Sequence, residues 1–281
     1  GVVADTPPVQ RVNGSLKFTQ DTMDSKDLEG QWLGQPLFIR ITTDARGALM
    51  DITGRASIAE LRQYYGLPIF DQLSGKTDWQ AQVAIRGGVA DLTINSDLRG
   101  LTSSLPEPFN KAAGTALPLT MAKVSGATNA KTPGSLQITR LTLGNAAAAT
   151  IGTNARGQLV RGRVLVGSGQ RQALPDQPGL QLESLKPVDL DFWAKAIGMG
   201  PGAAGNPSSA TKRNANPLSI TIRAPVVTAF GRRFQDMRAT VQSATDRTHI
   251  QMASRELQGD LDWFSPGTSE GGERGLVQGH L

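Results

Sequence analysis

The sequence contains no cysteine and only two histidines, His249 and His280, among its 281 residues. Without cysteine the chain can form no disulfide and offers no thiolate as a nucleophile or metal ligand. Neither histidine has sequence neighbours that suit a general base or a metal site. The sequence therefore predicts a protein that is not an enzyme, with no cofactor and no bound metal.

Aromatic residues, long apolar runs and concentrated charge are also scarce. Aromatic residues make up 5% of the chain, and no run approaches the roughly 18 apolar residues of a membrane span. The net charge is +5, and apart from Lys212–Arg213 and Arg232–Arg233 the basic residues are scattered. Nucleic-acid binders gather such charge into a stripe with interleaved aromatic residues, so no nucleic-acid partner is predicted. Scattered charge is typical of a solvated surface, and attraction to anionic lipid headgroups is the alternative.

The chain begins Gly-Val-Val-Ala, without an initiator methionine and without the features of a signal peptide. We therefore expect it to be a piece of a longer protein or a processed product. Its length suits one large all-β domain or two smaller ones, and it is sufficient to bury a sizeable core.

What the sequence does contain is glycine (32 residues), proline (16 residues) and repeated strand-like alternation. Apolar residues alternate with polar ones from Asp78 to Arg86, the pair Gly87–Gly88 follows, and the alternation resumes from Ala90 to Asn95. This is the pattern of a β-hairpin with one apolar and one polar face. A second hairpin is predicted around the turn from Asp44 to Gly47. The same alternation recurs along the chain and predicts a mainly β protein.

Two segments break the alternation and predict short amphipathic helices. Ser57-Ile-Ala-Glu60 has the form of a capping box and predicts a helix near residues 57–66. Asp189 occupies an N-cap position and predicts a second helix near residues 189–198.

The composition of residues 200–217 is typical of a flexible loop. Together with the two helices it suggests two comparable units, residues 1–125 and residues 126–281, each with a series of strands and one helix. No sequence repeat of fixed period accompanies this weak symmetry.

Paired carboxylates and a glycine-bearing segment give no sign of catalysis. Asp189 and Asp191 belong to a helix start, where acidic side chains favour the positive end of the helix. Asp260 and Asp262 are two residues apart in a strand, so they share its polar face. The segment GTNARG, which begins at Gly152, lacks the Lys-Ser/Thr pair that a P-loop requires.

The segment LTSSLPEPFNKAAGTALPL, residues 101–119, interrupts two strand-like stretches. Its prolines cannot donate ladder hydrogen bonds, and each biases the residue before it toward extended geometry. We therefore expect an extended crossing between two strands, the second of which begins at Leu117 or Leu119.

The apolar strand faces have two interpretations. They can form the closed core of a β-sandwich or barrel, which would make the chain a structural or interaction module with no lipid ligand. Alternatively, a sheet can keep its apolar face open as a trough for an extended apolar ligand. Aliphatic walls with few aromatic residues suit acyl chains, but composition does not choose between the two.

Several sequence phrases follow one another in a recognisable order. The most specific phrase lies within residues 97–119, with the pattern L-x-G-L-x-S-x-LP-x-P-x-x-K-x-A followed by LPL. The other phrases are GQWLGQPLFIRI (residues 30–41), LSGKTDWQAQVAI (73–85), RELQGDLDWFSPG (255–267) and RGLVQGHL (274–281). In this order the phrases resemble the YhdP family of the bacterial AsmA-like superfamily. The resemblance spans most of the chain and is least clear at residues 128–200.

The resemblance implies a protein of the Gram-negative cell envelope, anchored in the inner membrane and extending through the periplasm. It implies a long curved antiparallel β-sheet that forms an open hydrophobic groove, and a role in carrying phospholipids between the inner and outer membranes. This chain would then be one segment of the conduit. Its partners would be phospholipid acyl chains, the rest of the same longer chain, and components of both membranes.

We expect the groove to be lined by apolar residues from one face of each strand. These residues are Trp79, Val83, Ile85, Leu92, Ile94, Leu136, Ile138, Val164, Val166, Ile220, Ile222, Val241, Ile250, Met252 and Leu261.

Overall fold

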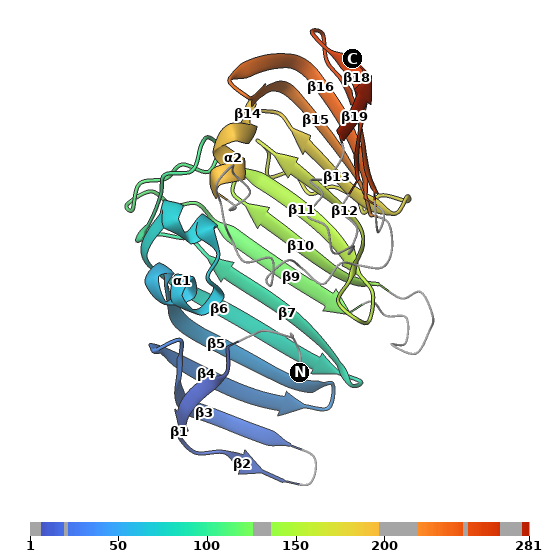
Figure 1. Cartoon of the computed structure of the whole chain (residues 1–281). Coiled ribbons are helices and arrows are strands. Elements are labelled where there is room, and N and C mark those ends of the chain that lie inside the picture. The colour runs from blue at the N-terminus through green and yellow to red at the C-terminus, as the bar shows by residue number, and fades with distance from the viewer. Residues whose placement is uncertain are drawn as a thin grey trace, which may run out of the picture. The chain divides into compact units, whose positions relative to one another are not determined.

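The structure is a computed structural model, which describes residues 7–19, 22–125, 136–196, 218–243, 247–264 and 277–280. Within these residues the chain is mainly β, with two α-helices (Figure 1). The chain divides into two compact units, Gly1–Gly144 and Asn145–Leu281. The boundary expected from the sequence lay earlier, between residues 125 and 126. None of the helices among the described residues has both the length and the apolar character of a membrane span.

Unit 1 contains one antiparallel sheet. Strands β3 to β7 pair in sequence order, β9 then pairs with β7, and β10 pairs with β9. β1 and β2 both pair with β3, and β8 pairs with the first residues of β6. No pairing among the described strands closes the sheet on itself, so the open sheet expected from the sequence is confirmed. The strands are β1 (Val9–Asn13), β2 (Lys17–Phe18), β3 (Met23–Trp32), β4 (Gln35–Asp44), β5 (Gly47–Ser57), β6 (Leu73–Arg86), β7 (Val89–Ser96), β8 (Leu101–Ser103), β9 (Leu119–Ser125) and β10 (Gln137–Leu143).

Both predicted hairpins of unit 1 are confirmed. Asp44 pairs with Gly47 across the β4–β5 turn, and Arg86 pairs with Val89 across the β6–β7 turn. In the second turn Gly87 and Gly88 have φ angles of 56° and 77°. A two-residue hairpin turn of this kind requires positive φ at both positions, which glycine adopts without a steric cost.

Helix α1 (Ile58–Tyr65) follows β5, and the capping box expected at its start is wrong in detail. Ser57 is the N-cap, but its side chain makes no capping hydrogen bond. The Glu60 carboxylate instead accepts two hydrogen bonds from Nε2 of Gln35, at 2.8 and 2.9 Å. Tertiary packing therefore uses Glu60 to tie α1 to the start of β4. A 3-10 helix, η1 (Pro68–Gln72), then leads into β6.

The proline-rich segment forms the expected crossing from β7 to β9, and β9 begins at Leu119. Lys111 fixes this crossing. Its side chain is buried (8% exposed), and Nζ donates to the carbonyls of Leu101 at 2.7 Å and Ala112 at 3.1 Å. Burial lowers the pKa of Lys111 because removal from water disfavours the charged form.

Unit 2 also contains an open sheet, but a mixed one. The order of neighbours is β11, β12, β13, β15, β16, β17, β18 and β19, and β14 pairs with the last part of β15. The pairs β12–β13, β13–β15 and β14–β15 are parallel, so the expectation of a wholly antiparallel sheet is wrong at these strands. The strands are β11 (Ala147–Thr153), β12 (Leu159–Val166), β13 (Gly179–Ser184), β14 (Val188–Asp189), β15 (Leu218–Ala229), β16 (Arg232–Ser243), β17 (Arg247–Ala253), β18 (Gln258–Phe264) and β19 (Val277–His280).

The parallel pairs follow from connections that cross over a face of the sheet, as parallel neighbours require. The connection from β12 to β13 crosses the face that carries Thr150 and Arg161. Oγ1 of Thr150 donates to the carbonyl of Gln172 at 2.8 Å, and Nη1 of Arg161 donates to that of Asp176 at 3.2 Å. This connection covers part of the face that alternation alone marks as polar.

Helix α2 (Leu190–Ala196) begins one residue after Asp189, as predicted. Oδ1 of Asp189 accepts a hydrogen bond from the N–H of Phe192 at 2.9 Å, which is the geometry of an N-cap. The predicted end of this helix and the predicted loop at 200–217 lie outside the described residues.

Candidate functional site

In unit 1, strand register aligns apolar side chains across one face of the sheet. One row contains Ile39, Ile52, Ala81, Ile94, Met121 and Leu141, and therefore runs from β4 to β10. The next row contains Ile41, Met50, Val83 and Leu92 and reaches Lys123 on β9. We call this surface the unit 1 apolar face. Directly opposed side chains on such a face contact one another, so the rows are continuous.

The unit 1 apolar face contains a hollow of about 400 Å³, which falls in the usual range of ligand pockets. Helix α1 contributes Ile58 and Leu61 to its wall, and the proline-rich crossing contributes Leu98 and Leu101. The remaining lining residues are Pro7, Val9, Trp32, Leu37, Ile52, Ala56, Thr77, Trp79, Ala81, Leu92, Ile94, Ser96 and Leu119. The hollow is therefore walled by the sheet, by one helix and by the crossing together.

Almost no polar group in this hollow is left to bind a polar ligand. Its two hydroxyl side chains, Thr77 and Ser96, lie within hydrogen-bond distance of each other at 3.2 Å, and Ser96 donates to the carbonyl of Asp78 at 2.6 Å. Trp32 and Trp79 contact each other edge to face, with ring centroids 5.7 Å apart. The exception is the Nε1 atom of Trp79, which is buried and has no hydrogen-bond partner. A ligand held here would be recognised by apolar contact.

In unit 2, register builds a second face of the same kind, which we call the unit 2 apolar face. One row contains Ile151, Gly162, Leu180, Ile220, Val241, Ile250 and Leu261, and thus runs from β11 to β18. The neighbouring row contains Ala149, Val164, Leu182, Ile222, Ala239, Met252 and Gly259. A β-carbon at Gly162 would lie 2.7 Å from Cδ1 of Ile151. The neighbouring side chain therefore covers this glycine, and the row stays apolar there.

The structure brings most of the expected lining residues together within each unit. Trp79, Leu92 and Ile94 line the hollow, and Val83 and Ile85 share its face through the β5–β6 register. All eight expected residues of unit 2 lie on the unit 2 apolar face. These are Val164, Val166, Ile220, Ile222, Val241, Ile250, Met252 and Leu261.

Ile138 and Leu136 were also expected to line the groove, but the structure does not place them with the other lining residues. Ile138 pairs with Val124, and the register puts this pair on the face opposite Met121 and Leu141. Leu136 precedes β10, whose pairing with β9 begins at Gln137. The apolar alternation of β10 is in fact carried by Leu141 and Leu143, which pair with Met121 and Leu119.

Sequence reasoning also missed part of the hollow. Leu37 and Ile52 lie on strands that show the apolar–polar alternation, so the alternation would have been sufficient to place them among the expected lining residues. Ile58, Leu61 and Leu98 come from the helix and the crossing, which strand alternation does not describe.

Most of the expected lining residues are not fully buried. Of the fifteen expected lining residues, Ile85 is exposed (37%) and the other fourteen are half-buried. Some apolar side chains of the unit 1 apolar face are buried, namely Ile41 and Ala81 in its rows and Leu37 and Ile58 in its hollow. Leu165 and Val227 are buried in unit 2 and belong to neither row of its apolar face.

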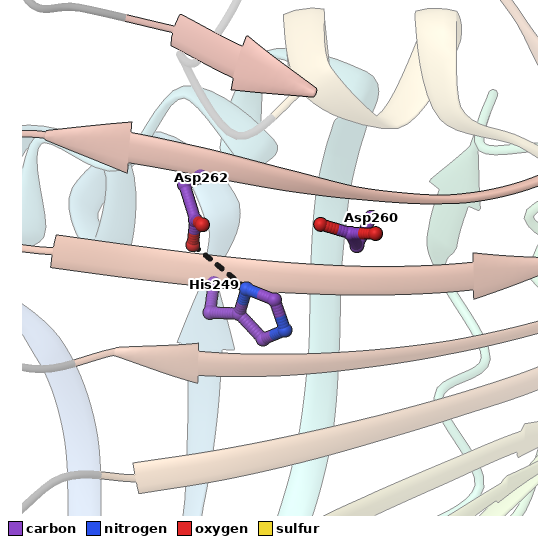
Figure 2. A group of neighbouring side chains, drawn as sticks. All are labelled: His249, Asp260 and Asp262. Carbon is purple, nitrogen blue, oxygen red and sulfur yellow. Dashed lines mark hydrogen bonds and ion pairs between the residues drawn. The ribbon is translucent and has the colours of Figure 1, made fainter. Parts of the chain in front are cut away.

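A polar group of a different kind lies on the opposite face of unit 2. Nδ1 of His249 lies 2.7 Å from Oδ1 of Asp262, and Asp260 is close to both (Figure 2). His249 was expected to have no suitable neighbours, and this was wrong, because the β17–β18 register supplies two carboxylates from a strand further along the chain.

Comparison with known proteins gives two matches. The family model described as "YhdP protein" matches residues 2–273. The chain is 26% identical over 270 residues to the "Intermembrane phospholipid transporter YhdP" of Escherichia coli (strain K12), which covers 90% of this chain and 20% of that protein. The chain thus spans about a fifth of the length of this relative. No solved structure matches the chain.

Proposed function

The chain belongs to the YhdP family, and from that premise we propose that it is a segment of a conduit that carries phospholipids across the periplasm. The acyl chains lie along the apolar faces of the two units, while the headgroups stay in water. The rest of the longer chain and components of the inner and outer membranes are its partners, in the envelope of a Gram-negative bacterium. The protein performs no reaction and needs no cofactor.

The observation that carries this proposal is the continuity of the apolar rows, whose side chains in unit 2 are half-buried. In unit 2 the row from Ile151 to Leu261 crosses seven strands without a charged side chain. Each methylene group that leaves water gains about 0.8 kcal/mol. A polar side chain in the row would therefore raise the free energy of an acyl chain that passes it. An unbroken apolar row lets the acyl chain move without entering water.

The hollow of unit 1 supports the same function in a second way. It is walled by aliphatic and tryptophan side chains, and its hydroxyl groups bond to each other and to the backbone. Such a surface favours apolar chains without selecting one by hydrogen bonding.

Native mass spectrometry of the gently purified chain tests this function. We expect bound phospholipid on the unaltered chain and loss of that lipid in Ile222→Asp, which places a charge in the middle of the unit 2 apolar face. Thr221→Asp is the matched control, because Thr221 is the adjacent half-buried residue on the other face of the same strand. We expect this control variant to retain lipid.

A closed β-sandwich module without a lipid ligand is the alternative. It predicts no bound lipid on the unaltered chain and unfolding of Ile222→Asp. In a closed core Ile222→Asp would cost several kcal/mol and unfold the unit. An absence of lipid on the unaltered chain, together with unfolding of Ile222→Asp, would therefore contradict the conduit. Circular dichroism of both variants separates loss of lipid from loss of fold.

A further inference from the structure

Three side chains with metal-binding chemistry meet on the polar face of strands β17 and β18. Asp260 and Asp262 are two residues apart on β18, so they lie on the same side of the sheet. The antiparallel register places His249 of β17 directly opposite Asp262. Figure 2 shows the three side chains close together on these neighbouring strands. The arrangement brings together residues separated by more than ten positions in the sequence.

The distances between the donor atoms suit a single ion. One ligand atom from each residue lies within 4.8 Å of the others, and Nδ1 of His249 is 2.7 Å from Oδ1 of Asp262. Zinc binds nitrogen and oxygen ligands at about 2.0–2.2 Å, which sets the ligand atoms of a tetrahedral site roughly 3–3.5 Å apart. To hold an ion, the 2.7 Å distance between Nδ1 of His249 and Oδ1 of Asp262 must lengthen slightly, and the longer distances to Asp260 must shorten. Small side-chain rotations are sufficient for both changes.

The partial burial of these side chains and the kinds of donor atom that they offer also suit a metal ion. The His249 and Asp262 side chains are 24% and 17% exposed, so the pair is shielded but remains open to solvent on one side. One imidazole and two carboxylates form a nitrogen and oxygen donor set that suits zinc and similar divalent transition metals. Three ligands on one face of a sheet leave the outward position to water.

We propose that His249, Asp260 and Asp262 form a binding site for a zinc-class divalent cation. The ion cross-links β17 and β18 on the face opposite Ile250 and Leu261. It therefore lies away from the unit 2 apolar face, and its binding does not depend on the proposed lipid function. The alternative is a cross-strand histidine–aspartate pair that binds no metal.

Isothermal titration of Zn²⁺ into the chelator-treated 281-residue chain tests the site. We expect one equivalent to bind, and binding at least tenfold weaker in His249→Ala and in Asp260→Asn. Asp51→Asn is the control, because Asp51 is also a half-buried strand aspartate with a cross-strand partner, Gln82, at 2.9 Å. It should bind Zn²⁺ like the unaltered chain.

Co²⁺ provides a second readout, because its visible absorption reports a tetrahedral protein site. The spectrum should appear with the unaltered chain and with Asp51→Asn, and it should be lost in His249→Ala. Circular dichroism without metal checks the fold, and the isosteric Asp260→Asn serves if His249→Ala does not fold. Absence of saturable Zn²⁺ binding, or equal binding by all the variants, would overturn the proposal.

Discussion

The two units present similar apolar faces but differ in what covers their sheets. In unit 1, helix α1 and the proline-rich crossing wall a hollow on the apolar face itself. In unit 2, the β12–β13 connection bonds to Thr150 and Arg161 on the other face. Strand alternation is the same in both, so the connections between strands decide which face is enclosed. An apolar face can therefore be walled into a pocket or left as an open row without any change in strand pattern.

Truncation of one leucine in each unit should give the largest difference. Leu37 is 2% exposed in the wall of the hollow, so Leu37→Ala should lower the free energy of unfolding by about 2–5 kcal/mol. Leu182 is half-buried on the unit 2 apolar face, so Leu182→Ala should cost roughly 1–2 kcal/mol. Urea denaturation measures both values. Equal losses would mean that the two faces are enclosed to the same degree.

Loss of the buried lysine should loosen the wall of the hollow. Lys111→Ala removes the Nζ donor to the carbonyls of Leu101 and Ala112. The carbonyl of Ala112 still accepts from the N–H of Thr115 at 3.1 Å, and the loss should cost about 1–3 kcal/mol. Hydrogen exchange followed by mass spectrometry should show faster exchange in residues 98–119 and unchanged exchange in β15 and β16. Lys111→Met keeps most of the side-chain volume and removes the donor. If Lys111→Met matched the unaltered chain, the hydrogen bonds would not be what holds the crossing.

The hairpin turns of the two units differ in the residue that adopts a positive φ angle, and we expect a smaller effect on stability from this difference. The β6–β7 turn of unit 1 places Gly87 at φ 56°, whereas the β15–β16 turn of unit 2 places Phe230 at φ 53°. A non-glycine residue in this conformation costs roughly 1–2 kcal/mol. Phe230→Gly should therefore stabilise unit 2, and Gly87→Phe should destabilise unit 1 by a similar amount. Thermal unfolding of the two variants should shift in opposite directions, and shifts of the same sign would refute this account.

The smallest expected effect is the acid sensitivity of the same unit 2 turn. The Asp191 carboxylate accepts hydrogen bonds from the N–H groups of Gly231 at 2.9 Å and Phe230 at 2.8 Å, and these bonds lower the pKa of Asp191. A carboxyl group with a lowered folded-state pKa stabilises the fold above its ordinary value, about 3.8. This stability is lost as the pH falls through the lowered pKa.

Asp191→Asn should remove this contribution to the pH dependence of stability in unit 2. Hydrogen exchange in the Gly87–Gly88 turn of unit 1 should be the same in Asp191→Asn and in the unaltered chain. Hydrogen exchange at Phe230 and Gly231 between pH 5 and pH 3, corrected for intrinsic rates, is the measurement. An unchanged pH profile in the variant would show that Asp191 does not hold the turn.

Much of the local structure could be predicted from the sequence. The alternation from Asp78 to Asn95 and the glycine pair between its two halves were sufficient for the β6–β7 hairpin, because both strands and their turn are neighbours in the chain. The N-cap role of Asp189 was predictable for the same reason.

Predictions failed where a residue's partner is distant in sequence. Glu60 was expected to cap its own helix, but it bonds to Gln35 on β4. Ile138 was expected with the groove residues, and its pairing with Val124 places it on the other face of the unit 1 sheet. His249 was expected to lack neighbours, and Asp262 lies across the strand pair from it. Each failure concerns a register or contact that alternation cannot specify.

The sequence by itself determined that the chain is mainly β, that its strands have one apolar face, and that it belongs with the YhdP family. These properties depend on side-chain type and local spacing, which a single strand or turn already expresses. Only the tertiary structure decided that three strand pairs of unit 2 are parallel, that Leu98 and Leu101 help to wall a hollow, and that His249 meets Asp260 and Asp262. Those outcomes depend on which strands become neighbours and in what register, and this is settled by packing across the whole unit.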